Sequence, residues 1–112
     1  MSKQSHQEDL CPKLTSAMQL FGKRWVGLII YTLLTGPKRF RDIEKSLPIS
    51  GKLLAERLRE LEKYKLVIRH VYPEVPVRIE YELTENGKAM QPIIEAIQEW
   101  AESLPLEDIC QD

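Results

Sequence analysis

The sequence predicts an α+β domain made of helices with one β-hairpin near the middle of the chain. Apolar residues recur every three or four positions over most of its length, which is the helical period. Between positions 66 and 83 the sequence instead becomes rich in strand-forming residues on either side of a Pro-Glu-Val-Pro turn, and apolar and charged residues alternate in the second of these runs, 77–83. With 112 residues, 43% of them apolar, the chain has the size and composition of one folded domain.

The first predicted helix begins at Pro12, because proline is favoured at the first helical position, where its missing N–H has no partner. Leu14, Met18 and Phe21 follow helical spacing, and Gly22 ends the run. A second helix is expected over about residues 23–34, before the Thr-Gly-Pro break. Its predicted apolar face consists of Trp25, Leu28, Ile29 and Thr32/Leu33.

Two further helices follow. A short one carries Phe40, Ile43 and Leu47 and stops before Pro48. The next is capped by Ser50 and buries a leucine stripe. The helical period places Lys52, Glu56 and Arg59 on the face opposite that stripe, which consists of Leu54, Leu58 and Leu61.

After the hairpin, Thr84 is expected to cap one long final helix with Gly87 in its first turn. Its apolar positions continue to Leu104, and Pro105 closes it. We therefore divide the chain into a flexible N-terminus (1–9), a folded domain (10–104) and an acidic tail (105–112).

The net charge of −1 conceals a strong asymmetry. Residues 23–69 contain twelve basic and five acidic residues, a balance of +7, whereas residues 70–112 contain two basic and ten acidic residues, a balance of −8. A basic centre favours a polyanionic partner, although uneven surface charge alone would also produce this pattern.

The order of elements is that of a winged helix-turn-helix with an N-terminal helix and a long C-terminal dimerisation helix. In this fold an amphipathic helix packs one face on the domain and offers the other to the major groove of double-stranded DNA. The helix over 50–63 has that division, and the hairpin is the wing. The predicted DNA contacts are Lys38, Arg39, Arg41, Ser50, Gly51, Lys52, Glu56, Arg59 and Arg78.

Six motifs in combination resemble the HxlR family of bacterial winged-helix transcription regulators, relatives of the MarR type. They are Cys-Pro at 11–12, Gly-Lys-Arg-Trp at 22–25, Gly-Pro-Lys-Arg-Phe at 36–40, Leu-Arg-Glu-Leu-Glu at 58–62, Tyr-Pro-Glu-Val-Pro at 72–76 and Tyr-Glu-Leu-Thr-Glu-Asn-Gly at 81–87. The resemblance implies a homodimer that binds a palindromic operator and usually represses a nearby gene. Gly51 departs from the family, which more often has a longer polar side chain there.

Dimerisation is also expected from the sequence, because the last helix has more apolar circumference than one small domain can cover. Packing within one subunit is the alternative. The predicted interface consists of Leu14, Met18, Phe21, Ile93, Ile97, Trp100 and Leu104.

Cys11 stands at the start of the first helix, where the helix dipole and Lys13 favour an anionic sulfur. The family resemblance implies that a cysteine at this position senses oxidants, quinones or aldehydes. It further implies Cys110 of the other subunit as a candidate disulfide partner. A second Cys11, a small-molecule thiol, and a purely apolar packing role for Cys11 all stay open.

Other functions find less support. The two histidines and two cysteines lack metal-ligand spacing, no catalytic constellation or cofactor motif is present, and we expect no enzyme activity. The longest uncharged stretch, 25–37, is too short to span a bilayer, and no signal peptide is visible, so we expect a cytoplasmic protein. Two alternatives remain: the same DNA-binding function with a non-covalent small-molecule effector, and a winged-helix module that binds a protein.

Overall fold

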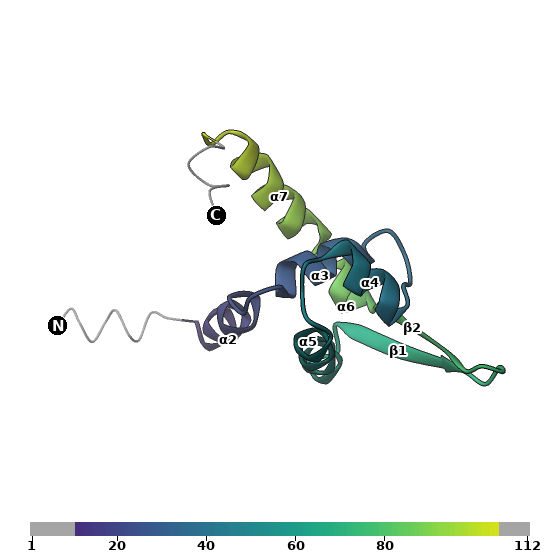
Figure 1. Cartoon of the computed structure of the whole chain (residues 1–112). Coiled ribbons are helices and arrows are strands. Elements are labelled where there is room, and N and C mark those ends of the chain that lie inside the picture. Colours follow the sequence, from purple (N-terminus) through teal and green to yellow (C-terminus); the bar gives the residue numbers. More distant parts are fainter. Residues whose placement is uncertain (1–10, 106–112) are drawn as a thin grey trace.

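The computed structural model describes residues 11–105 and confirms an α+β winged helix-turn-helix (Figure 1). Cys110 and the segments before residue 11 and after residue 105 lie outside the described residues. The order of elements is α2 (Pro12–Phe21), α3 (Val26–Leu33), α4 (Phe40–Ser46), α5 (Gly51–Lys63), β1 (Val67–Tyr72), β2 (Arg78–Leu83), α6 (Glu85–Lys88) and α7 (Gln91–Glu102).

The core lies where α3, α4 and α5 meet the base of the hairpin. Every large side chain of this core is aliphatic, which suits the close packing of a small domain. The buried residues are Leu20, Val26, Ile29, Ile30, Leu33, Ile43, Ile49, Leu54, Leu58, Leu61, Val67, Leu83 and Ile94. The predicted leucine stripe of α5 is therefore confirmed.

Helix α3 begins at Val26, three residues later than expected. Residues 23–25 instead form a turn, in which Trp25 takes the left-handed φ of 80°. This change of direction rotates the following helix, so that Val26 and Ile30 are fully buried and Leu28 is half exposed. Of the predicted apolar face, Ile29 and Leu33 are buried, Trp25 is half-buried against the core, Thr32 is half-buried, and only Leu28 is exposed.

The prediction of a single long final helix is also wrong, because the chain forms two helices there, α6 and α7. Thr84 caps α6 as expected, with its Oγ1 accepting the Gly87 N–H at 3.1 Å. Pro92 stands in the first turn of α7, where it favours a new helix start and cannot continue the hydrogen-bond ladder of the preceding one. The break lets α7 leave the domain in its own direction.

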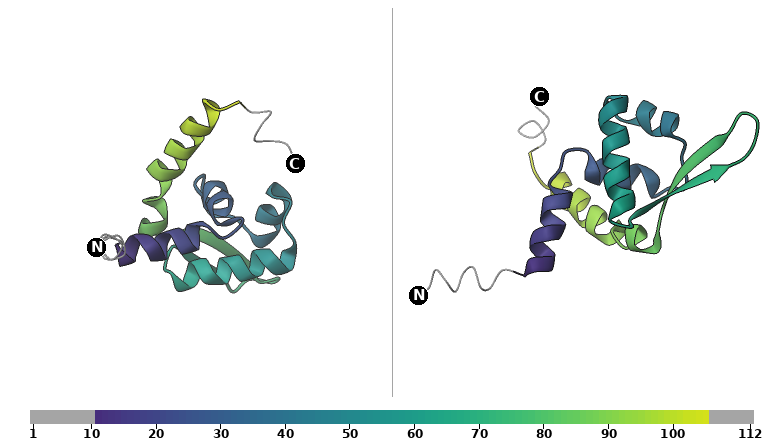
Figure 2. Two further views of the ribbon diagram at one scale, coloured as in Figure 1. Left: turned by 90° about the vertical axis from the view of Figure 1, so that its left-hand side faces the viewer. Right: turned by 90° about the horizontal axis from the view of Figure 1, so that it is seen from below.

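The hairpin is an antiparallel pair whose register places Val67 opposite Leu83 and Tyr72 opposite Arg78. Its base is widened by Lys38, whose backbone N–H and C=O both bond to Tyr81, at 2.9 and 2.8 Å. Figures 1 and 2 show the hairpin projecting beyond the helices, while α2 and α7 extend as separate arms elsewhere on the domain. No helix within residues 11–105 is long and apolar enough to cross a membrane.

Candidate nucleic-acid interface and thiol site

Helix α5 presents a polar face to solvent, as its sequence period predicts. Lys52 and Arg59 are exposed and Glu56 is half-buried, opposite the buried leucines. The first turn is fixed by Ser50, whose Oγ accepts the Leu53 N–H at 3.1 Å. The helix start is therefore rigid, and its free N–H groups and dipole favour an anion there.

Gly51 lies where α4 and α5 approach each other closely. A Cβ at this position would be 2.9 Å from Oε2 of Glu44 and 3.9 Å from the ring of Phe40. The Glu44 carboxylate thus occupies the space that a longer side chain at position 51 would need. A negative charge beside the first turn of α5 also suits the helix dipole.

The three basic residues around the start of α4 have different roles. Arg39 and Arg41 are exposed. Lys38 is half-buried and donates through Nζ to Oγ1 of Thr35 at 2.7 Å, while its backbone extends the sheet. Arg39 and Arg41 therefore have the greater freedom to meet a phosphate.

A polar clamp ties α5 to the turn between α2 and α3. Lys23 Nζ lies 2.8 Å from Glu60 Oε2, and Arg57 donates to the backbone oxygen of Arg24 at 2.9 Å and to Glu60 Oε1 at 3.4 Å. The hydrogen bond from Lys23 is the main cause that lowers the pKa of Glu60, and Arg57 adds to it. Sequence reasoning missed this clamp, since residues 23 and 60 are far apart along the chain.

On the hairpin, Arg78 is held by two carboxylates. It lies 2.9 Å from Glu74 and 2.6 Å from Glu80, and its guanidinium stacks over the ring of Tyr72, 3.9 Å from the centroid. The hydrogen bond from Arg78 lowers the pKa of Glu74, and the two carboxylates raise the pKa of Arg78. The DNA contact predicted for Arg78 stays a prediction. Its guanidinium already forms ion pairs with Glu74 and Glu80.

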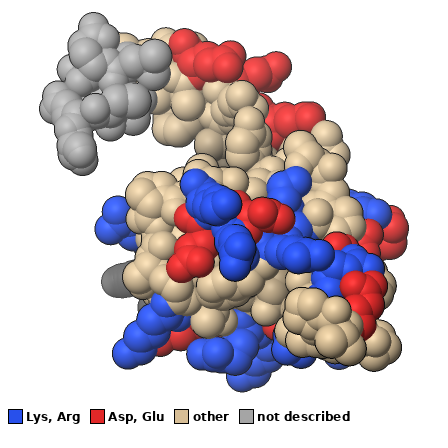
Figure 3. Space-filling model, turned by 45° about the vertical axis from the view of Figure 1, so that its right-hand side comes forward, with Lys and Arg blue, Asp and Glu red and all other residues tan. Residues whose placement is uncertain are grey.

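A polar cleft separates α5 from the hairpin, and the sequence prediction did not include it. Its volume is about 380 Å³. It is lined by Ala55, Arg59, Glu62, Arg69 and Tyr81. Figure 3 shows Lys and Arg side chains over the body of the domain with acids between them, whereas the projecting upper part carries acidic side chains. The three charged residues of α7, Glu95, Glu99 and Glu102, are all acidic.

The thiol of Cys11 lies at the free end of α2. The residue is exposed, and its Sγ accepts the Leu14 N–H at 3.4 Å, which makes the sulfur the N-cap of the helix. The backbone oxygen of Cys11 also accepts the Thr15 N–H at 2.9 Å. The position of the sulfur is therefore fixed by the helix start, as the Cys-Pro pair indicated.

The arms α2 and α7 expose large apolar side chains. Leu14 and Met18 are each 56% exposed and Trp100 is 63% exposed, whereas Phe21 and Leu104 are half-buried. Ile93 and Ile97 are exposed on the same arm as Trp100. These exposed side chains belong to the predicted dimer interface, which stays a prediction.

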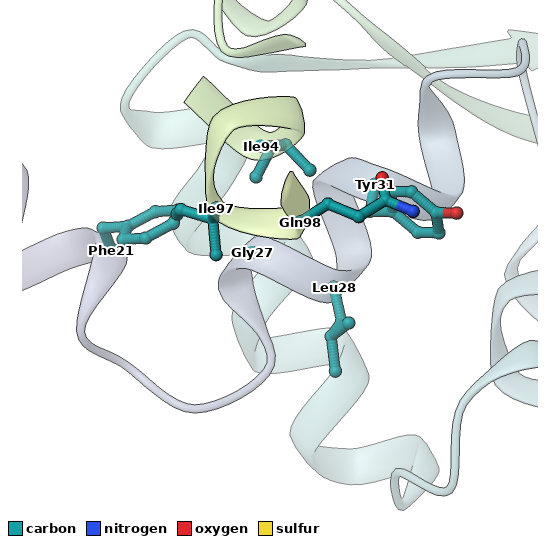
Figure 4. A pocket seen from close by; sticks show the side chains of 7 residues that line it. All are labelled: Phe21, Gly27, Leu28, Tyr31, Ile94, Ile97 and Gln98. Atoms are coloured by element: carbon teal, nitrogen blue, oxygen red, sulfur yellow. The ribbon is translucent and has the colours of Figure 1, made fainter. Parts of the chain in front are cut away.

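Between these arms and α3 lies an apolar pocket of about 380 Å³ (Figure 4). Phe21 lies at one end of it and Tyr31 at the other. The lining residues are Phe21, Gly27, Leu28, Tyr31, Ile94, Ile97 and Gln98. Within residues 11–105 no group of three or more His, Cys, Asp or Glu side chains could hold a metal ion.

Comparison with known proteins places these features in context. The family model described as HxlR-like helix-turn-helix matches residues 20–107. The transcriptional regulator YodB of Bacillus subtilis is 49% identical over 106 residues, which cover 92% of this chain and 95% of YodB. The chain spans nearly the whole length of that relative.

Solved structures agree with this match. The reduced form of YodB superposes with a TM-score of 0.76 at 50% identity, covering 91% of this chain and 96% of that one. Quinone-bound YodB gives a TM-score of 0.75 at 48% identity, covering 85% and 100%. The oxidised redox regulator HypR gives 0.78 at 38% identity, covering 85% and 98%.

Proposed function

Since the chain belongs to the HxlR-like helix-turn-helix family and is a transcription regulator of the helix-turn-helix type, we propose that it is a cytoplasmic repressor that binds a palindromic operator as a homodimer. We further propose that oxidants or electrophiles which react with Cys11 release it from DNA. The observation that carries the proposal is the pairing of an exposed polar face on α5 with an exposed, helix-capping thiol on α2.

The exposed apolar arms support the homodimer. Leu14 and Met18 on α2 and Ile93, Ile97 and Trp100 on α7 are too exposed to contribute fully to the core of one subunit. A second copy would cover them with the same surface, which is how two-fold dimers form. Two recognition helices related by that axis would meet half-sites about 34 Å apart, one turn of DNA.

The location of Cys11 supports thiol control. Its sulfur is exposed at the end of an arm that we assign to the dimer interface, so a covalent change there can alter how the two subunits meet. The similar protein YodB has been solved in reduced, diamide-treated and quinone-bound forms. HypR, a redox regulator, has been solved in its reduced and oxidised forms.

Two chemical routes fit this thiol. With diamide, two thiols lose two electrons and two protons as the S–S bond forms, and the N=N bond of diamide takes them up. With a quinone, the thiolate adds to a ring carbon, an S–C bond forms, and the displaced electron pair collects on a carbonyl oxygen that is then protonated. The disulfide partner of Cys11 is open between Cys110 of the second subunit, a second Cys11 and a small-molecule thiol.

The operator is tested by selecting duplexes from a random pool with the reduced protein. We expect the enriched sequence to contain two inverted half-sites whose centres are about 10 base pairs apart. A single unrepeated motif would contradict the palindrome, and no enrichment at all would contradict DNA binding. A reporter gene placed behind the selected site distinguishes repression from activation.

Thiol control is tested on the selected duplex with Cys11→Ser and Cys110→Ser. Both reduced variants should bind like the wild type, because neither change touches α5. We expect diamide and a quinone to release the wild type and to leave Cys11→Ser bound. Equal release of Cys11→Ser and the wild type would refute the role of Cys11, while the response of Cys110→Ser to diamide tells whether Cys110 is the partner.

The apolar pocket favours a second mode of control, in which a non-covalent effector binds between α3 and α7. Its volume of about 380 Å³ lies within the range of small-molecule sites, and its lining is mostly aromatic and aliphatic. Phe21 of this pocket stands at the opposite end of α2 from Cys11, about 15 Å away along a ten-residue helix. A thermal-shift screen of apolar ligands on Cys11→Ser would therefore report this pocket without the thiol.

A further inference from the structure

The hairpin carries two arginines that face opposite sides of the sheet. Paired residues share a face and neighbours along a strand alternate. The register pairs Arg69 with Tyr81 and Tyr72 with Arg78. Arg69 therefore lies on the side of the buried Val67, next to α5, while Arg78 lies on the other side.

Arg78 offers no free charge to a phosphate. Its guanidinium donates to Glu74 at 2.9 Å and to Glu80 at 2.6 Å and covers the ring of Tyr72. One arginine with two carboxylates carries a net charge of −1. A phosphate that displaced these partners would leave two anions beside it, which opposes binding.

Arg69 has different surroundings. It is exposed and lines the polar cleft together with Arg59 and Glu62 of α5 and the ring of Tyr81. Neither Arg59 nor Arg69 forms an ion pair with any residue that the structure describes. The three charged side chains leave the cleft with a net charge of +1, and both guanidinium groups have unused donors.

The cleft lies where the DNA backbone would run. When α5 occupies the major groove, a phosphate backbone borders the groove on each side of the helix, and the cleft lies along the side of α5 that faces the hairpin. Guanidinium groups bind phosphate oxygens in pairs, so two arginines on opposite walls suit one backbone phosphate better than one arginine alone.

We propose that a phosphate of the DNA backbone binds in this cleft between Arg69 of β1 and Arg59 of α5, and that Arg78 is a positioning residue that stiffens the hairpin without contacting DNA. The inference rests on the proposed DNA-binding function. It assigns to Arg69 the contact between the wing and the DNA backbone. Arg69 was not among the DNA contacts predicted from the sequence.

The test measures binding to a mixed-sequence duplex by fluorescence anisotropy over a series of salt concentrations. One lost phosphate contact lowers the slope of log affinity against log salt by about 0.9. We expect that loss in Arg69→Gln, a slope restored in Arg69→Lys, and an unchanged slope in Arg78→Gln. A thermal melt of each variant shows that the domain is folded, and only folded variants enter the comparison.

The possible outcomes distinguish the phosphate contact in the cleft from the DNA-binding function as a whole. An Arg69→Gln slope equal to that of the wild type overturns the assignment, and so does an Arg78→Gln slope lowered by about one unit. If the wild type binds the duplex with a salt-dependent affinity and Arg69→Gln leaves the slope unchanged, the DNA-binding function stands and the cleft assignment falls. A wild type with no salt-dependent affinity for any duplex would refute the function itself.

Discussion

Replacing Gly87 with alanine should destabilise the domain, although alanine is the better helix former. A Cβ at position 87 would lie 2.2 Å from the backbone oxygen of Leu66 and 3.0 Å from Cδ2 of Leu83. Cβ atoms essentially never approach within 3.0 Å of another heavy atom, so the carbonyl must retreat by at least the difference of 0.8 Å. That same carbonyl accepts the Thr84 N–H at 3.0 Å, a bond that the retreat would stretch or break.

The expected cost follows from three contributions. Overpacking costs about 2 kcal/mol, the lost hydrogen bond about 1 kcal/mol, and the helix propensity of alanine returns about 1 kcal/mol. The free energy of unfolding should therefore fall by about 2 kcal/mol, which lowers the melting temperature by roughly 10 °C in a domain of this size. Position 87 thus tests the contact between α6 and Leu66, the residue directly before β1, and not the backbone conformation of glycine.

Urea unfolding followed by circular dichroism measures this change, at one protein concentration, because dimerisation stabilises the folded state. Gln19→Gly, at an exposed position of α2 outside the proposed interface residues, is the matched control and should cost about 0.5 kcal/mol from helix propensity. A Gly87→Ala variant that is more stable than the wild type would show that the Leu66 carbonyl yields without loss and would refute the reasoning.

Three further predictions concern caps, the clamp and the dimer. Ser50→Ala should cost about 1 kcal/mol in urea unfolding, because the Leu53 N–H loses its cap, whereas Ser50→Asp should not. Glu60→Gln should lower the free energy of unfolding by about 0.5 kcal/mol at neutral pH and leave it unchanged in acid. The pKa of Glu60 is lowered in the folded state, so its ion pairs stabilise the fold at pH values above the unfolded-state pKa, and this stabilisation is lost as the pH falls through the folded-state pKa. Equal costs at both pH values would contradict this. Trp100→Glu should be a monomer by light scattering, whereas the wild type and Glu95→Gln should be dimers. A dimeric Trp100→Glu would show that Trp100 of α7 does not belong to the interface.

Local signals predicted most of the fold. Ser50 and Thr84 each cap a helix through a hydrogen bond to the N–H three residues on, and such a bond depends only on nearby sequence. The alternation of residues over the hairpin and the leucine period of α5 likewise depend on local geometry. Hence the order of elements and the exposed face of α5 could be read from the sequence.

Of the two errors in the fold, the late start of α3 arose from contacts between distant segments, whereas the split of the final helix had a local signal. The left-handed Trp25 is compatible with a turn held by the core, and no local pattern marks a non-glycine residue for that conformation. Gly87 looked like a weak point in a helix, but its missing side chain lets α6 approach the backbone of Leu66. The split at Pro92 was available from the sequence, because proline favours the first turn of a helix over its interior.

Charged side chains were the least predictable part of the site. Sequence position showed that Arg78 lies on the hairpin, but its partners depend on the turn that brings Glu74 back toward it. Glu80 could have been anticipated, since residues two apart on a strand share a face. Arg69 went unnoticed because only the packing of β1 beside α5 gives it a cleft to line.

The clamp on α5 bears on how a thiol at Cys11 could affect DNA binding. Helix α2 has the thiol at its first turn, and the turn that follows α2 is tied to α5 by Lys23–Glu60 and by the bond from Arg57 to Arg24. Arg57 is only 17% exposed at its side chain, so this connection is among the less solvated polar contacts of the surface. In the proposed mechanism this ten-residue helix moves as one unit, so a covalent constraint at Cys11 also displaces the turn at the other end of α2. Under the proposed mechanism, α5 would respond to Cys11 through its own subunit as well as through the dimer interface.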